Sequence, residues 1–488
     1  MIDVFLDANA KRGATRHLFE QLRDGIVTGR LAVGDRLPSS RDLAIELGVS
    51  RHTVTTVYGR LTAEGYVEGR AGGGSVVSRA ATASSHRRKT SALAARHALR
   101  QAAVESVDNP APSASQFDLR SGVPDARLFP LQAWRQSVAA TLHLTPPGYG
   151  DAAGAPELRR TIAHWVAKSR AVDADADQIV ITAGAQQAVD LVVRLLAGHG
   201  DVIAVEDPGY APVRRLCLAA GATVVPVPVD NDGLRVDLLP VKARIVYTTP
   251  SHQSPTGVTM SLARRRELLA IAERHNIAII EDDYDSEYRH VNRPLEPLHT
   301  LDRAGRVIYI GTFSKVLSPS LRLGYAVLPD ALVGPAINLR RLMDCQPNHI
   351  IQQAMHRFMA DGHFERHLRR TRKIYSERHD LATAFVAEQV VNGTLHRIGT
   401  SNAGLHVTAH LPTGVDEHAT IARLRARDVI VGSYYDCWIS NNPQPGLIVG
   451  FGNTNTDDLP SALQIIGDVL QDQPRRVRPR RAPNRASR

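Results

Sequence analysis

The sequence predicts two differently folded units, a small winged helix-turn-helix and a large α/β unit with a mostly parallel central sheet. Helical apolar spacing on both sides of the turn Gly48–Ser50 predicts the first unit. Short β-rich runs alternate with helical stretches from about residue 116, and near-continuous apolar runs are typical of buried parallel strands. A stretch rich in Ala, Ser and Arg between Arg79 and Ser115 separates the two patterns and predicts a linker.

Length and composition exclude several classes of protein. A chain of 488 residues is long enough for more than one domain, and its 43% hydrophobic and 22% charged residues are ordinary for a globular protein. The sequence has no apolar run of about 18 residues and no basic-then-apolar leader, so we expect a cytoplasmic protein without membrane contact. The widely separated Cys217, Cys345 and Cys437 lack metal-ligand spacing, so we expect reduced thiols and no metal site.

Changes in composition predict four segments. These are a winged helix-turn-helix domain over residues 1–78, a flexible linker over 79–115, the α/β domain over 116–474 and a disordered basic tail over 475–488. A flexible linker of 37 residues spans roughly 30–37 Å, enough to let the N-terminal unit reach another subunit. The tail holds seven arginines in a chain of net charge +10. It either adds nonspecific attraction to phosphates or is a solvated segment without a role.

The first unit has the pattern of a DNA-reading helix. We expect a short helix over Arg41–Leu47, a turn, and a second helix over Arg51–Leu61 that begins at the N-cap Ser50. Two short strands around the glycine tip Gly72–Gly74 predict a wing whose amides can approach a phosphate. The apolar stripe of the second helix consists of Val54, Val57, Tyr58 and Leu61. Its opposite face presents Arg51, His52, Thr53, Thr55, Thr56 and Arg60 to base edges and phosphates.

A helical pair alone is weak support for DNA binding, but the flanking residues are more specific. The stretch from Gly29-Arg-Leu31 through Gly34-Asp-Arg-Leu37-Pro38 to Glu64-Gly65-Tyr66 resembles the winged helix of GntR-type repressors over about 60 residues. Some members carry a further Arg where Thr55 stands, which implies a different base preference here. The resemblance implies a double-stranded DNA operator as partner, contacted by Ser40, Arg41, Ser50, Arg51, His52, Thr53 and Gly73.

The second unit holds the groups that pyridoxal phosphate requires. Lys315 follows the apolar run Val307–Ile310 and is the predicted catalytic residue, because its amine can form a Schiff base. Asp282 follows the run Ile277–Ile280 and is expected to keep the pyridine nitrogen protonated. Asp283 is the alternative, since a one-residue slip at a strand end reverses which side chain points inward.

The remaining cofactor groups also occur in order along the chain. Gly184, Ala185 and Gln186 begin a helix whose amides and partial positive charge suit a phosphate. Arg322 offers the phosphate a cation, and Tyr210 offers the ring an aromatic face. Taken singly, each has a plainer explanation as a surface lysine, a helix cap or a core tyrosine. Their order along the chain and their flanking residues argue against a chance occurrence of these groups.

With those flanking residues, the stretch from about Gln116 to Pro474 resembles the fold-type I aminotransferases. Tyr149, in Tyr149-Gly150-Asp-Ala-Ala-Gly154, matches a family tyrosine that reaches the phosphate of the neighbouring subunit, which implies a homodimer with shared sites. Ser254 stands where the enzymes usually have an Asn that donates to the ring hydroxyl, and Tyr284 is the expected second donor.

One departure from the enzymes affects the predicted activity. Ile448 stands where aminotransferases commonly carry the Arg that binds the substrate α-carboxylate. The resemblance therefore implies poor turnover of amino acids, unless Arg120 or another residue substitutes. Whether the protein is an enzyme at all stays open at this point, with weak aminotransferase-like half-reactions as one possibility.

A GntR-type winged helix joined by a long linker to an aminotransferase-like domain is the architecture of MocR-type regulators. The segments Thr249–Gly257, Glu281–Glu287 and Gly311–Gly324 resemble signatures of that family. The resemblance implies a head-to-tail homodimer that binds DNA and senses pyridoxal phosphate, or an amine captured by it as an external aldimine.

Within that family, control of vitamin B6 synthesis is the first interpretation, and sensing of the GABA or taurine type stays open. Two other functions compete with this one. The first is an active aminotransferase with an accessory DNA-binding module. The second is a repressor that has lost its cofactor and keeps the fold for dimerisation.

Overall fold

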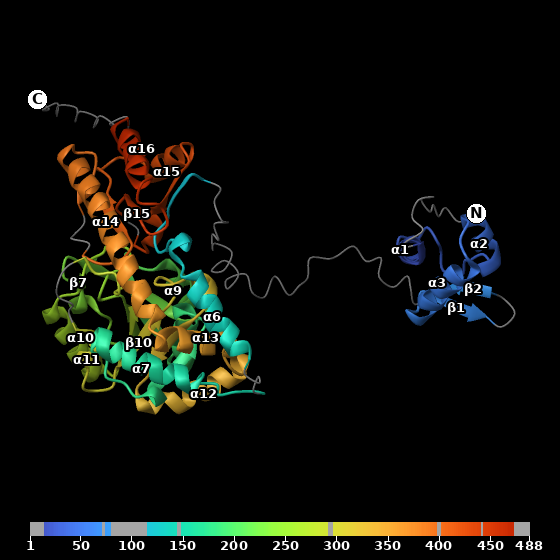
Figure 1. Ribbon diagram of the computed structural model, residues 1–488, viewed down its shortest axis with the longest axis horizontal. Coiled ribbons are helices and arrows are strands. Elements are labelled where there is room, and N and C mark those ends of the chain that lie inside the picture. The colour runs from blue at the N-terminus through green and yellow to red at the C-terminus, as the bar shows by residue number, and fades with distance from the viewer. Residues whose placement is uncertain are drawn as a thin grey trace, which may run out of the picture. The chain divides into compact units, whose positions relative to one another are not determined.

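The computed structural model describes residues 14–70, 74–79, 115–143, 148–290, 296–397, 402–440 and 443–472. The chain divides into two compact units, Met1–Ala98 and Leu99–Arg488, each with its own hydrophobic core (Figure 1). The predicted linker, apart from Arg79 and Ser115, and the predicted basic tail lie outside the described residues. Within the described ranges, no helix has both the length and the apolar character needed to cross a membrane.

The N-terminal unit is a winged helix-turn-helix, as the sequence predicts. Its elements are α1 (Ala14–Val27), α2 (Ser40–Leu47), α3 (Arg51–Ala63), β1 (Val67–Arg70) and β2 (Gly74–Val77). Gly48 turns the chain between α2 and α3 with a φ of 64°, a conformation that glycine adopts without steric cost. Ser50 caps α3 by accepting a hydrogen bond from the amide of Thr53 at 3.1 Å. The predicted apolar stripe, Val54, Val57, Tyr58 and Leu61, is buried.

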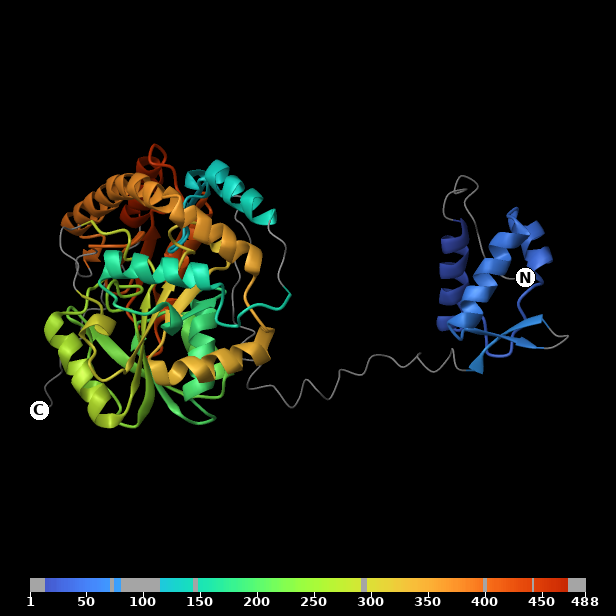
Figure 2. The ribbon, with the colours of Figure 1, turned by 60° about the horizontal axis from the view of Figure 1, so that its bottom comes forward.

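The larger unit is built on an eight-stranded sheet in the order β4-β11-β10-β9-β8-β5-β6-β7 (Figure 2). The neighbours from β10 to β6 are parallel, β11 is antiparallel to both its neighbours, and β7 is antiparallel to β6. The predicted mostly parallel sheet is therefore confirmed. Its strands are β4 (Ile179–Thr182), β5 (Val202–Asp207), β6 (Thr223–Asp230), β7 (Gly233–Leu234), β8 (Ala243–Thr248), β9 (Ala278–Asp283), β10 (Val307–Thr312) and β11 (Gly324–Val327).

Both faces of this sheet are covered, which explains why its strands read as continuous apolar runs. Ile280 and Ile308 pack in one core cluster with α8, whereas their neighbours Ile279 and Val307 pack in another with α10. The helices of the unit are α6 (Leu131–Leu142), α7 (Pro156–Arg170), α8 (Ala185–Leu196), α9 (Ala211–Ala219), α10 (Leu262–His275), α11 (Leu298–Leu301), α12 (Asp330–Asp344), α13 (His349–Ala360), α14 (His363–Val391), α15 (Glu417–Arg425) and α16 (Leu459–Gln471).

A second, five-stranded sheet has the order β12-β13-β15-β14-β3. Its strands are β3 (Phe117–Leu119), β12 (His396–Arg397), β13 (His406–His410), β14 (Val429–Ser433) and β15 (Gly446–Gly450). Because β3 pairs with β14 in parallel, the first strand of this unit joins its C-terminal part. The long helix α14 contacts both α13 and the strands β12 and β13, and so connects the two parts (Figure 1).

Candidate functional site

A cavity of about 370 Å³ lies where the carboxyl ends of β8, β9 and β10 meet the amino ends of α8 and α9. In open α/β sheets this edge is the usual place for ligands. Eight of the ten residues that the sequence assigns to the cofactor line this cavity. Those lining it are Ala185, Gln186, Tyr210, Ser254, Asp282, Tyr284, Lys315 and Arg322, and Gly184 precedes the first of them.

Lys315 follows β10 and points its amine into the cavity. The Nζ atom donates a hydrogen bond to the carbonyl oxygen of Gly122 at 2.8 Å. Burial lowers the pKa of the Lys315 amine, although the charges of Asp285 and Asp282 oppose this shift. A lowered pKa increases the fraction of neutral amine, which is the form that attacks a carbonyl carbon.

The structure distinguishes the two candidate carboxylates on β9. This strand runs on through Asp283, beyond the predicted end at Ile280, so Asp282 and Asp283 face opposite sides of the sheet. Asp283 accepts from Arg170 at 2.6 Å and from the hydroxyl of Tyr309 at 2.6 Å, away from the cavity. The side chain that lines the cavity is Asp282.

Asp282 has one engaged oxygen and one free oxygen. Its Oδ2 accepts a hydrogen bond from the hydroxyl of Tyr247 at 2.7 Å. Its Oδ1 is buried and has no hydrogen-bond partner among the described residues. Burial raises the pKa of Asp282 to about 7. A buried, unpartnered carboxylate oxygen is costly to keep, so this atom is suited to a hydrogen-bond donor supplied by a ligand.

A cation and a helix amino terminus meet at one end of the cavity. Gly184 has a φ of 92° and precedes α8. The Arg322 guanidinium packs so closely that a Cβ on Gly184 would lie 3.2 Å from its Nη2. This nitrogen donates to the carbonyl oxygen of Ala183 at 2.5 Å. Amides at a helix start beside a guanidinium form a site for a phosphate.

Tyr210, Ser254 and Tyr284 line the rest of the predicted ring site. Tyr210 caps α9 and is 38% exposed, so part of its ring is available to a ligand. Burial raises the pKa of Tyr284 well above its ordinary value, and its hydroxyl therefore keeps its proton. Ser254 and Tyr284, the two candidate donors for a ring hydroxyl, also hydrogen-bond one another.

Tyr149 is the predicted cofactor residue that lies away from the cavity of its own chain, with 89% of its surface exposed. Ile448 is 4% exposed and forms part of the cavity wall. Arg120, the suggested substitute for a carboxylate-binding arginine, is held by Asp118 through contacts of 2.8 and 2.6 Å. Among the described residues that line the cavity, the cations are Lys315 and Arg322.

The cavity is also lined by three residues that were not predicted from the sequence, Tyr247, Thr312 and Ser314. Thr312 and Ser314 stand within the Gly311–Lys315 motif, and their position beside Lys315 was a usable signal. Tyr247 gave no local signal, because it reaches Asp282 from the neighbouring parallel strand β8.

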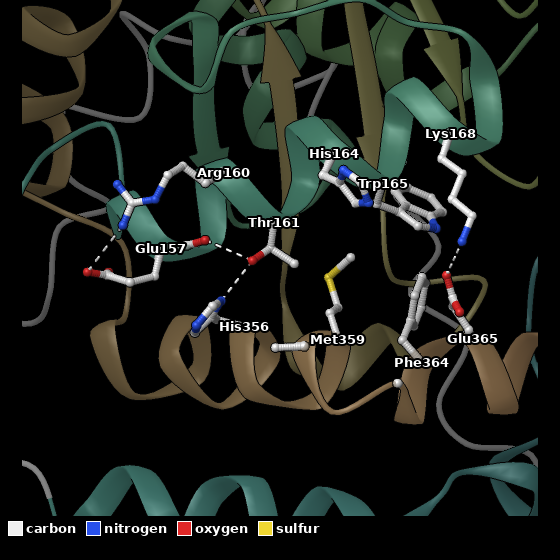
Figure 3. Close-up of a pocket in the computed structure, with 12 residues that line it drawn as sticks. Glu157, Arg160, Thr161, His164, Trp165, Lys168, His356, Met359, Phe364 and Glu365 are labelled. Carbon is white, nitrogen blue, oxygen red and sulfur yellow. Dashed lines mark hydrogen bonds and ion pairs between the residues drawn. The ribbon is translucent and has the colours of Figure 1, made fainter.

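A larger cavity of about 580 Å³ lies between α7 and the segment from α13 to α14 (Figure 3). Its side chains pair mainly with one another. Lys168 contacts Glu365 at 3.0 Å, and Thr161 contacts Nδ1 of His356 at 2.8 Å. Its charged groups are thus partly neutralised within the protein, and it lacks the reactive amine of the smaller cavity.

In the N-terminal unit, the outward face of α3 begins with Arg51 and His52, which are exposed, as is Arg41 on α2. Ser40 lies 3.5 Å from Nε of Arg51 and Thr53 lies at the capped end of α3. Several residues of the predicted face have partners within the unit. Thr55 and Thr56 donate to carbonyl oxygens of their own helix, and Arg60 pairs with Glu64. Gly73 lies outside the described residues.

Comparison with known families matches the two units separately. The model for bacterial regulatory proteins of the gntR family matches residues 14–77, and the model for aminotransferase class I and II matches residues 114–442. The probable rhizopine catabolism regulatory protein MocR of Rhizobium meliloti is 34% identical, over 91% of both chains. The HTH-type pyridoxine biosynthesis transcriptional regulator PdxR of Corynebacterium glutamicum is 31% identical, over 96% of this chain and 98% of its own.

Two solved enzymes resemble the larger unit. An archaeal alanine:glyoxylate aminotransferase is 28% identical with a TM-score of 0.69, and covers 79% of this chain and 96% of its own. The kynurenine aminotransferase of Pyrococcus horikoshii is 25% identical with a TM-score of 0.67, and covers 80% of this chain and 96% of its own. The match to enzymes extends over the larger unit, whereas the match to regulators extends over nearly the whole chain.

Proposed function

Because this chain belongs to the MocR-type transcriptional regulators, in which a GntR-family domain is joined to an aminotransferase class I and II domain, we propose that it regulates transcription in response to pyridoxal phosphate or to an amine captured by it. The observation that carries the proposal is the cavity in which Lys315 lies with Asp282 and Arg322. These groups accompany a DNA-binding domain on the same chain.

The residues of the cavity fit pyridoxal phosphate. The unpartnered Oδ1 of Asp282 suits the N–H of a pyridinium ring, and the Gly184 backbone beside Arg322 suits the phosphate. When bound, the cofactor supplies an aldehyde that condenses with an amine and a ring that withdraws electrons.

The protein's own residues act on that group in distinct ways. Lys315 offers the amine, with a pKa that burial lowers. Asp282 would hold the ring proton, Ser254 and Tyr284 would donate to the ring hydroxyl, and Tyr210 would pack on the ring face.

We further propose a homodimer. The 89% exposure of Tyr149 supports a role toward a neighbouring subunit, because an exposed tyrosine is available to a partner. In a head-to-tail dimer, the segment over residues 79–115 would act as a flexible linker and would leave two winged helices for a pair of half-sites. Ser40, Arg41, Ser50, Arg51, His52, Thr53 and Gly73 would contact the operator.

Control of vitamin B6 synthesis is the preferred pathway for this regulator. The relative PdxR is named for pyridoxine biosynthesis, and Ile448 occupies the cavity wall where an amino-acid enzyme commonly has arginine. The same observation weighs against an active aminotransferase, whose substrate carboxylate needs a cation that is not already assigned to the cofactor.

The proposal is tested by fluorescence anisotropy with DNA from upstream of this gene and its neighbours, titrated with pyridoxal phosphate. The wild type should change its DNA affinity as the cofactor is added, whereas Lys315→Ala should not. An effector shifts populations only if it binds the competing conformations with different affinity. DNA binding by the wild type that is indifferent to cofactor would contradict pyridoxal phosphate as the signal, and efficient transamination of amino acids would favour the enzyme.

A further inference from the structure

One buried histidine nitrogen beside the cavity contacts two side chains at once. Nδ1 of His252 lies 3.0 and 3.2 Å from the two carboxylate oxygens of Asp285, and 3.0 Å from the hydroxyl oxygen of Tyr284. His252 and Asp285 are both 2% exposed, so bulk water does not compete for these contacts. The ring of His252 is also held against the backbone, because a Cβ on Gly404 would lie only 2.1 Å from its Cε1.

The number of protons determines the direction of these hydrogen bonds. A carboxylate only accepts, so the proton shared with Asp285 must sit on Nδ1 of His252. Toward this nitrogen the Tyr284 oxygen can then only accept, and its own proton is free to point elsewhere. Tyr284 lines the cavity and hydrogen-bonds Ser254, which lines it as well, so the directions left to this proton lie on the cavity side.

We propose that His252 and Asp285 are a positioning pair that holds the hydroxyl proton of Tyr284 toward the cavity, where it donates to the ring oxygen of pyridoxal phosphate. The inference rests on the proposed cofactor site. Both residues act through Tyr284 and neither lines the cavity.

A metal ion is a poorer explanation of the same side chains. His252, Asp285 and His406 place potential ligand atoms within 4.8 Å of one another. However, Nδ1 of His252 bonds Asp285, and Nε2 of His406 lies 3.1 Å from the carbonyl oxygen of Pro255. These hydrogen bonds account for the cluster, and the second one anchors the chain next to Ser254.

The pair has a measurable consequence in the absorbance of the bound cofactor. When the nitrogen that links Lys315 to the cofactor loses its proton, the ring oxygen carries a full negative charge. A donor at that oxygen favours this state and lowers the pH of the absorbance transition. Loss of the donor should raise the transition by about one pH unit, the scale of one hydrogen bond to a charged group.

Asp285→Asn separates this effect from a simple loss of charge. With an amide at 285, Nδ1 is no longer required to carry the proton, so Tyr284 can donate to it and turn its proton away from the cavity. The transition then rises by about one pH unit. Loss of the negative charge alone would lower it, because Asp285 favours the protonated form of Lys315. The other charges that act on Lys315, Asp282 and Arg322, stay unchanged.

Three further variants complete the test. Tyr284→Phe should raise the transition as Asp285→Asn does, and the double variant should show no additional rise, since both remove one hydrogen bond. His252→Phe should behave like Asp285→Asn, whereas His252→Asn keeps an N–H near the position of Nδ1 and should restore most of the wild-type value. Asp380→Asn is the matched control, because Asp380 pairs with Nδ1 of His379 at 3.3 Å and does not line the cavity.

A downward or absent shift in Asp285→Asn, or full additivity with Tyr284→Phe, would overturn the positioning pair. If Asp285→Asn does not fold, the His252 variants give the same comparison. In cofactor-free protein labelled with ¹⁵N-histidine, the wild type should show His252 protonated at Nδ1 and Asp285→Asn should not. A wild type that binds no pyridoxal phosphate would refute the proposed cofactor site, while the ¹⁵N measurement would still decide on the pair.

Discussion

The adjacent carboxylates of β9 should respond in opposite ways to the same substitution. Asp283 and Arg170 form an ion pair at 2.6 Å, with side chains that are 1% and 3% exposed. Asp283→Asn leaves the guanidinium buried without its counter-ion, which should cost about 3–5 kcal/mol of unfolding free energy. The loss should be present across the neutral range, because Arg170 stays charged there.

Asp282→Asn should instead stabilise the cofactor-free protein. Burial raises the pKa of Asp282 from 3.8 to about 7, so the folded state binds this proton more tightly than the unfolded state. The penalty for ionising Asp282 is absent below pH 3.8, grows as the pH rises through the interval to 7, and is complete above it. At 1.36 kcal/mol per pH unit, the penalty reaches roughly 4 kcal/mol, and the amide removes up to that amount. Asn can still accept the hydrogen bond from Tyr247.

The assay is urea unfolding of the cofactor-free protein, followed by fluorescence of its three tryptophans, all in the larger unit, at pH 5 and pH 8. The difference between Asp282→Asn and wild type should grow from pH 5 to pH 8, while Asp283→Asn should be less stable at both. The same Asp282→Asn protein should bind pyridoxal phosphate more weakly, since the amide cannot balance a pyridinium charge. A loss of stability in Asp282→Asn as large as in Asp283→Asn would refute the assignment of Asp282 as the unpartnered carboxylate.

Three other predictions concern the amine, the recognition helix and the cavity wall. Borohydride reduction in the presence of pyridoxal phosphate should add the mass of the cofactor to wild type but not to Lys315→Ala, as measured by mass spectrometry. Persistence of the added mass in Lys315→Ala would reveal a second reactive lysine. Arg51→Ala should weaken operator binding by roughly 1–3 kcal/mol. Thr55→Ala should change the affinity little, because the hydroxyl of Thr55 bonds its own helix. Equal losses of affinity for the two variants in an anisotropy titration would contradict this assignment. Ile448→Arg should increase the affinity for amino acids, measured as a spectral change of the bound cofactor, and Ile448→Met should not. An unchanged amino-acid affinity in Ile448→Arg would show that this position does not limit carboxylate binding.

The sequence predicted those parts of the fold whose signals are local. The helix α3 begins at the predicted Arg51 and its apolar stripe is buried, because both depend on spacing along one segment. The predicted end of β9 at Ile280 was wrong. The strand continues through the acidic residues Glu281, Asp282 and Asp283. Tertiary partners overrode the local preference there, since Arg170 and Tyr309 satisfy Asp283 from sequence positions far away. Pairing across strands also explains why Tyr247 was missed.

The composition of the cavity supports a sensor more than an enzyme. Lys315, Asp282 and Arg322 are the groups proposed to hold a phosphorylated aldehyde, and all three line the cavity. Turnover of amino acids asks for a further cation at the carboxylate, and Ile448 forms that wall instead. A sensor has no need for efficient turnover, but it does need an effector that binds one conformation of the protein better than another. We therefore expect the energetic difference to arise where the cofactor binds, at the oriented hydroxyl of Tyr284 and the unpartnered oxygen of Asp282, rather than at a substrate carboxylate.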